Sequence, residues 1–284
     1  MTLAIPMMMS EIYGTGFRSL ESISNPAVYG VAIVLMTLYS LTHSLYTYLQ
    51  PLDEQSFEAP ELSWSSLVLF LVSWMLGSMI LITLISSLTA GWMIGMKLFI
   101  PYVIQSALGL LFLFLWSPSL PNKAIRLFQK TSISVSNIKK TFFLFGVTTV
   151  WIIFLQGAAQ FFLGPQKSQE ALRSLIQIAG NKSLFIMGFT IVIIAPIFEE
   201  FIFRGILFSW FMQRYRLIVS VVLSSFLFGL LHWDPVASPI IMVLGIALAM
   251  AYRITGNIWV SIGIHALWNL GAFMIQVSGR YAGW

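Results

Sequence analysis

The sequence contains no cysteine and few charged residues, and these two shortages limit the class of protein to which it can belong. The absence of cysteine excludes disulfides, thiolate nucleophiles and thiolate metal ligands. Charged residues make up only 9% of the 284 residues. Soluble domains carry roughly 25%, so this chain lacks the charge to cover a water-facing surface. Apolar residues reach 58% and recur in long runs, which predicts an integral membrane protein.

The formal net charge is +5, but the basic residues are scattered at the ends of apolar runs. The positive-inside rule describes this distribution for loops that flank membrane helices. We therefore expect membrane lipids, and no nucleic acid, around the protein.

Apolar segments long enough to enter a bilayer occur throughout the chain. A spanning helix needs about 20 apolar residues, and eight segments meet or approach that length. They lie at about 27–49, 67–89, 98–116, 141–163, 184–212, 217–232, 239–253 and 257–278. The expected fold is all-α, a polytopic transmembrane helical bundle of about eight membrane segments.

The connections between these segments divide the chain. The connection at 117–140 is basic, and we place a domain boundary there. Residues 1–140 then form N-terminal transmembrane helices of unknown role, and residues 141–284 form a second domain. The segments 217–232 and 239–253 look too short to span. Lipid cannot satisfy the backbone of the polar loop between them, so we expect a water-accessible pocket just after His232.

Two adjacent carboxylates, Glu199 and Glu200, lie inside an apolar run. Each charge at a helix centre costs about 2.5–3.5 kcal/mol on insertion scales. Arg204 follows Glu200 by four residues on the same helical face and is expected to pair with it. Glu199 projects about 100° away and is left to act as a base. The alternative is a buried ion pair that only fixes helix packing.

Two histidines, His232 and His265, lie within or at the end of apolar runs. Glu199 precedes Tyr215, in the expected turn, by 16 residues, and His232 follows it by 17. In an antiparallel hairpin these two side chains reach similar depth, as a carboxylate–imidazole pair requires. Phe228, four residues before His232, is expected to pack against and orient the imidazole.

Asn269 follows His265 by four residues, so both side chains project from one helical face. Their N–H groups form a donor pair that can stabilise an oxyanion in a site of low dielectric constant. The alternative is a hydrogen-bonded pair that serves helix packing.

Three motifs, in this order, resemble those of the CPBP family of type II CAAX prenyl endopeptidases, bacteriocin-processing and immunity proteins, and lysostaphin-resistance-like proteins. The motifs are Glu199-Glu200-x-x-x-Arg204, Phe228-x-x-x-His232 and His265-x-x-x-Asn269. The resemblance covers about 141–278. It implies an intramembrane endopeptidase of the bacterial plasma membrane that acts on membrane-embedded or lipid-tethered peptides or proteins.

The resemblance also implies roles for the motif residues. Glu199 and His232 would activate a water that attacks a peptide carbonyl, without a covalent intermediate or a cofactor. His265 and Asn269 would form the oxyanion hole. Glu200 and Arg204 would hold the site together.

Other functions stay open from the sequence. Glu199, His232 and His265 are also plausible zinc ligands, although no His-Glu-x-x-His motif occurs. Intramembrane carboxylates and histidines also mark proton-coupled transporters. A non-catalytic scaffold or immunity protein with the same fold is the remaining alternative.

Overall fold

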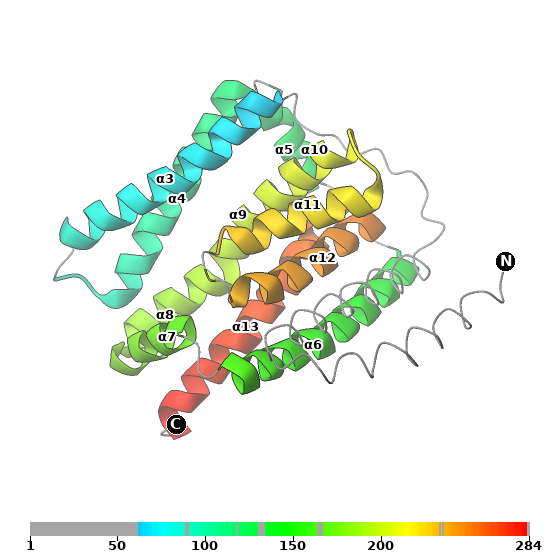
Figure 1. Cartoon of the computed structure of the whole chain (residues 1–284). Helices are drawn as coiled ribbons and strands as arrows, with labels where there is room; N and C mark the ends of the chain where they lie inside the picture. Colours follow the sequence, from blue (N-terminus) through cyan, green and yellow to red (C-terminus); the bar gives the residue numbers. More distant parts are fainter. Residues whose placement is uncertain are drawn as a thin grey trace, which may run out of the picture.

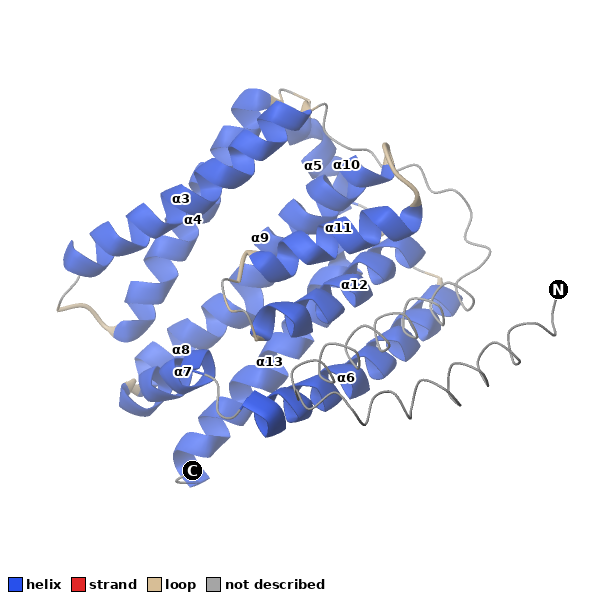
Figure 2. Ribbon diagram, in the orientation of Figure 1, coloured by secondary structure: helices blue, strands red, loops and turns tan. Residues whose placement is uncertain are grey.

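The computed structural model describes residues 62–88, 91–117, 119–129, 134–163, 167–232, 234 and 236–282. These ranges consist of helices and short connections, without a strand (Figure 2). Five of their helical stretches are long and apolar enough to cross a membrane: Ile94–Leu115, Thr141–Phe162, Asn181–Met212, Ala237–Thr255 and Ile258–Tyr281. The predicted all-α, polytopic membrane bundle is confirmed. The segment expected at 27–49 lies outside the described residues.

The first described helices are α3 (Trp64–Leu88) and α4 (Ile94–Trp116), which pack side by side (Figure 1). A short helix follows, α5 (Leu120–Gln129), in the basic connection for which no helix was expected. Apolar residues at intervals of three or four give α5 one face that packs inward. Phe128 of this face stacks on Phe201, and its carbonyl accepts a hydrogen bond from the Trp259 indole at 2.8 Å.

The remaining helices form the larger part of the bundle. They are α6 (Val135–Leu163), α7 (Lys167–Ile178), the composite span Asn181–Met212, α11 (Leu217–Leu230), α12 (Ala237–Thr255) and α13 (Ile258–Ala282). In Figure 1, α11 and α12 lie side by side, with α13 beside them and α6 beyond α12.

The composite span is not a uniform α-helix. It comprises α8 (Asn181–Phe189), η1 (Thr190–Ile194), α9 (Ala195–Glu200), η2 (Phe201–Phe208) and α10 (Ser209–Met212), where η1 and η2 are π-helical. The Ala195 amide bonds to the Thr190 carbonyl, five residues back. Pro196 has no N–H to continue this pattern. Two π-helical stretches therefore flank the short helix that carries the paired glutamates, and such stretches are frequent at functional sites.

The α11–α12 pair departs from the expected lengths at one of its two helices. α11 has 14 residues, but α12 has 19 and is long enough to span, so the prediction that segment 239–253 is too short was wrong. The carboxylate of Asp234 accepts the amides of Val236 and Ala237 at 2.9 Å, which caps the start of α12. Gly256 ends α12 in the left-handed conformation, with φ 58°.

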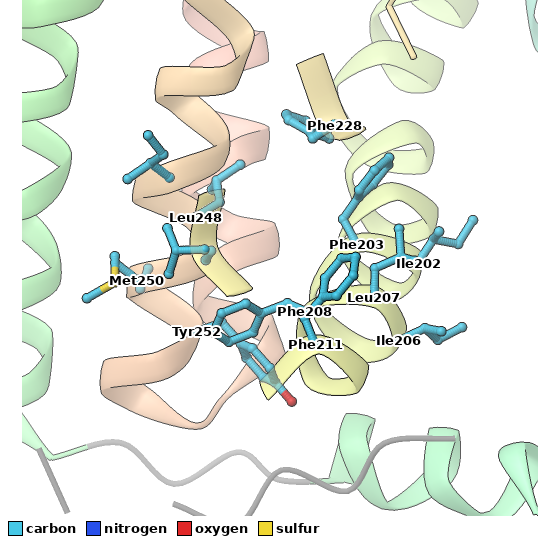
Figure 3. Close-up of a cluster of buried hydrophobic side chains, with 14 of the residues drawn as sticks. Ile202, Phe203, Ile206, Leu207, Phe208, Phe211, Phe228, Leu248, Met250 and Tyr252 are labelled. Carbon is cyan, nitrogen blue, oxygen red and sulfur yellow. The ribbon is translucent and has the colours of Figure 1, made fainter. Parts of the chain in front are cut away.

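The larger of two hydrophobic clusters in the described residues joins the N-terminal helices to the later ones. Figure 3 shows its centre, where Phe203, Phe208 and Phe211 of the composite span meet Phe228 of α11 and Tyr252 of α12. Residues of α3 and α4, among them Phe70 and Leu113, belong to the same core. The outer faces expose many large apolar side chains, as lipid-facing surfaces do.

Candidate active site

The four residues predicted to be catalytic line one cavity of about 520 Å³. They are Glu199, His232, His265 and Asn269. The cavity lies between α4, the composite span, α11, α12 and α13, and His232 stands at its exposed side. The structure thus brings together side chains from three separate helical segments, and it places a pocket at His232, where the polar loop predicted one.

Glu200 sits at the centre of a fully buried polar cluster. Arg204 donates from Nη1 to Glu200 Oε1 at 2.8 Å, the pair that the spacing of four predicts. His265 Nδ1 lies 2.9 Å from the same oxygen, and the Ser261 hydroxyl donates to Oε2. Arg204 also donates from Nη2 to the Gly245 carbonyl at 2.9 Å. The cluster therefore ties the composite span to both α12 and α13.

The ring of Phe228 lies between both histidines and the buried guanidinium. Its centroid is 5.1 Å from the His232 ring and 5.6 Å from the His265 ring, both in edge-to-face geometry. The Arg204 guanidinium carbon lies 4.5 Å from the Phe228 centroid, within cation–π range. Phe228 thus packs against both imidazoles.

The hydrogen bond of His232 defines its tautomer. Nδ1 lies 2.7 Å from the backbone carbonyl oxygen of Phe228. A carbonyl only accepts, so Nδ1 carries the proton, and Nε2 of the neutral imidazole keeps its lone pair. His232 is therefore oriented with a basic nitrogen available to the cavity.

Glu199 differs from its neighbour in exposure and in partners. Its side chain is 17% exposed, whereas that of Glu200 is completely buried. The Tyr102 hydroxyl of α4 donates to Glu199 Oε1 at 3.1 Å, and Oε2 lies 3.7 Å from His265 Nε2. Glu199 is thus held from two sides but still reaches the cavity.

Tyr102 is a site residue that the sequence interpretation missed, because residues 1–140 were assigned to transmembrane helices of unknown role. Its signal was a tyrosine in segment 98–116, whose other polar side chains are Gln105 and Ser106. The contact with Glu199 corrects that interpretation, since α4 supplies part of the site wall.

Asn269 holds the π-helical stretch in front of Glu199. Its Nδ2 donates to the Ile191 carbonyl at 2.9 Å. In a π-helix, the N–H group five residues later donates to this carbonyl. Five residues after Ile191 comes Pro196, which has no N–H. The Asn269 amide therefore replaces the missing backbone donor. An amide nitrogen carries two hydrogens, so one remains for a ligand in the cavity.

The structure also bears on the zinc alternative. Within the described ranges, no group of three or more His, Asp or Glu side chains is placed to hold a metal ion. His232 and His265 both use Nδ1 for protein partners, so only their Nε2 atoms face outward.

Comparisons with known proteins give one family and two bacterial relatives. Residues 181–271 match the family model described as type II CAAX prenyl endopeptidase Rce1-like. The chain is 27% identical over 164 residues to a Bacillus subtilis (strain 168) protein named "Putative membrane peptidase YdiL". It is 31% identical over 112 residues to "Membrane-embedded CAAX protease MroQ" of Staphylococcus aureus (strain USA300). No solved structure gives a significant match.

These alignments cover part of each protein. The first spans 56% of this chain and 64% of the relative, and the second spans 37% and 44%. The family match contains Glu199, His232, His265 and Asn269 but not Tyr102. Together with the apolar helices, the bacterial relatives support an integral, multi-pass protein of the plasma membrane. Residues 181–271 are therefore similar to the Rce1-like, type II CAAX prenyl endopeptidases, which confirms the resemblance predicted from the three motifs.

Proposed function

We propose that the protein is an intramembrane endopeptidase that hydrolyses a peptide bond with a water activated by Glu199 and His232. The observation that carries the proposal is the difference between the paired carboxylates. Glu200 is buried and bonded to Arg204, whereas Glu199 is partly exposed in the same cavity as the His232 imidazole. One carboxylate is thus used for structure, and its neighbour is available as a base.

The hydrolysis begins with a water between the Glu199 carboxylate and His232 Nε2. These groups take one proton as the water oxygen forms a bond to the peptide carbonyl carbon. The carbon–nitrogen bond then breaks, and the same proton passes to the leaving amine. The products are a carboxylic acid and an amine, and no covalent enzyme intermediate forms.

The oxyanion that forms during attack requires donors in the cavity. Asn269 has an amide hydrogen left after its bond to Ile191. His265 gives Nδ1–H to Glu200, so it can donate from Nε2 only as the imidazolium. We assign Asn269 Nδ2 and His265 Nε2 to the oxyanion.

Tyr102 is a positioning residue in this mechanism. Its hydroxyl occupies Glu199 Oε1 and leaves Oε2 for the water. The expected substrate is a membrane-embedded or lipid-tethered peptide or protein. The family description and the name of the Staphylococcus relative, a CAAX protease, favour a substrate cut near a lipid-tethered C-terminus.

The test uses purified wild type, Glu199→Ala and His232→Ala in detergent with a quenched peptide library, each with and without a chelator. We expect cleavage by the wild type, unaffected by the chelator, and no cleavage by Glu199→Ala or His232→Ala. Tyr281→Phe, at the far end of α13, is the control and should cleave normally. Loss of cleavage on chelation with recovery on zinc addition would instead make Glu199 and His232 metal ligands. Equal cleavage by all four proteins would reject the proposal.

A further inference from the structure

A second cavity adjoins the active site on the side of α6. It has a volume of about 220 Å³ and lies between α6, α12 and α13. Three of its lining residues, Ile241, Leu244 and Trp268, also line the active-site cavity. Trp268 directly precedes Asn269 in α13. The two cavities are thus separated by one layer of side chains beside the assigned oxyanion donor.

The wall of this second cavity on α6 carries two glutamines. Gln156 and Gln160 are four residues apart and therefore share one face of α6. Both lie in the candidate membrane span Thr141–Phe162. Neither side chain is hydrogen-bonded to any other residue that the structure describes.

The threonines of the same helix behave differently. Thr148 donates its hydroxyl to the Leu144 carbonyl, and Thr149 donates to the Phe145 carbonyl, both at 2.8 Å. Each hydroxyl is therefore satisfied within α6. Gln156 and Gln160 are exposed at the cavity rather than bonded within the helix. Lipid cannot satisfy a side-chain amide, so both amides are open to a polar ligand or to water.

The substrate of an intramembrane protease needs hydrogen-bond partners for its backbone. The peptide around the bond to be cut must be extended, and its N–H and C=O groups then lose their helical partners in a medium that offers none. A glutamine amide supplies both a donor and an acceptor. Apart from the two glutamines, the cavity of about 220 Å³ is lined by apolar residues.

We propose that this cavity is a substrate subsite, in which Gln156 and Gln160 bond to the backbone of an extended apolar peptide segment next to the scissile bond. The inference rests on the proposed function for the identity of its occupant. Trp268 then lies between the segment in the subsite and the bond that is attacked.

The experiment measures binding separately from cleavage. The proteins are the Glu199→Ala variant and the same variant with Gln156→Leu and Gln160→Leu. The probe is a fluorescent apolar octapeptide, and its binding in detergent is followed by anisotropy. Loss of two amide hydrogen bonds should weaken binding by about tenfold. Thr149→Val, on the same helix but bonded to its own backbone, is the matched control and should bind as its parent does.

A second probe identifies what the glutamines recognise. The same octapeptide with N-methylated backbone amides should bind the parent weakly, and the glutamine substitutions should then cost little more. The glutamine substitutions could instead weaken binding of the N-methylated octapeptide as much as binding of the unmodified one. The glutamines would then not bond to the peptide backbone, and the proposal would be overturned. The proposal would also be overturned if the glutamine substitutions left octapeptide binding unchanged. It would be overturned as well if a fluorescent fatty acid displaced the octapeptide equally from the parent and from the glutamine variant.

Cleavage by the otherwise wild-type protein distinguishes the two proposals. If Gln156→Leu with Gln160→Leu weakens octapeptide binding but no peptide is ever cut, the cavity is a peptide-binding site and the protease function fails. If peptides are cut with the same kcat/KM by wild type and the glutamine variant, the protease function stands and the subsite is rejected.

Discussion

The hydroxyl of Tyr102 on α4 donates a hydrogen bond to Glu199 Oε1, 3.1 Å away, across 97 positions of sequence. A hydrogen bond to a charged group contributes about 1.5–3 kcal/mol. We expect Tyr102→Phe to lower kcat by about 10- to 100-fold, the equivalent of that energy, with KM little changed, because only the orientation of the base is lost. Steady-state kinetics on a peptide that the wild type cuts would measure both constants.

The matched control for that prediction is Tyr281→Phe, which removes a hydroxyl from a side chain that is 72% exposed. It should leave kcat and KM unchanged. A Tyr102→Phe enzyme with normal kcat would show that Glu199 needs no partner on α4.

The ion pair of Glu200 and Arg204 should matter for stability even without substrate. Both side chains are fully buried, and removal of one partner of such a pair costs about 3–5 kcal/mol. Arg204→Ala should therefore lower the melting temperature in detergent. Arg204→Lys should recover only part of the loss, because one ammonium cannot reproduce the fork that reaches both Glu200 and the Gly245 carbonyl.

Arg216→Ala is the control for this series, since Arg216 is exposed in the turn before α11. An exposed substitution of this kind changes stability by less than about 0.5 kcal/mol. Equal melting temperatures for Arg204→Ala and Arg216→Ala would contradict a structural role for the buried pair.

The parts of the site that the sequence predicted are those set by helical periodicity. Glu200 and Arg204 meet because four residues separate them, and Phe228 meets His232 for the same reason. The pocket at His232 was predictable because a polar loop at membrane depth must face water or protein. Each of these inferences needed only local geometry or the chemistry of the solvent.

The parts that escaped prediction depend on contacts between distant segments. The bond of Tyr102 to Glu199 is set by where α4 packs, which no periodicity specifies. The π-helical stretches were also missed, because the η1 carbonyl at Ile191 is satisfied by Asn269 from another helix. Pro196 was a visible sign that the span would be irregular, but its consequence required the structure.

The close approach of α11 and α12 gives a prediction at Gly229. A methyl group there would lie 2.5 Å from the Ser238 carbonyl oxygen and 3.3 Å from Met242, so the helices must move apart. Gly229→Ala should cost about 1–3 kcal/mol of stability. Because His232 follows by three residues, kcat should fall as well. Thermal unfolding and peptide cleavage would measure the two effects.

Gly271→Ala serves as the control for that prediction, since nothing lies within 4 Å of a methyl group placed there. It should leave both stability and cleavage unchanged. If Gly229→Ala behaves in the same way, the two helices have more freedom to separate than their packing indicates.

Asn269 is expected to have two roles, and Asn269→Asp tests both because it keeps the shape and removes the donors. Without Nδ2 the Ile191 carbonyl loses its partner, so the melting temperature should fall. Loss of one oxyanion donor should also lower kcat by about 10²–10³-fold. Asn181→Asp, exposed at the start of α8, should change neither quantity. A lower melting temperature with normal kcat would restrict Asn269 to holding η1, and the oxyanion would then depend on His265 alone.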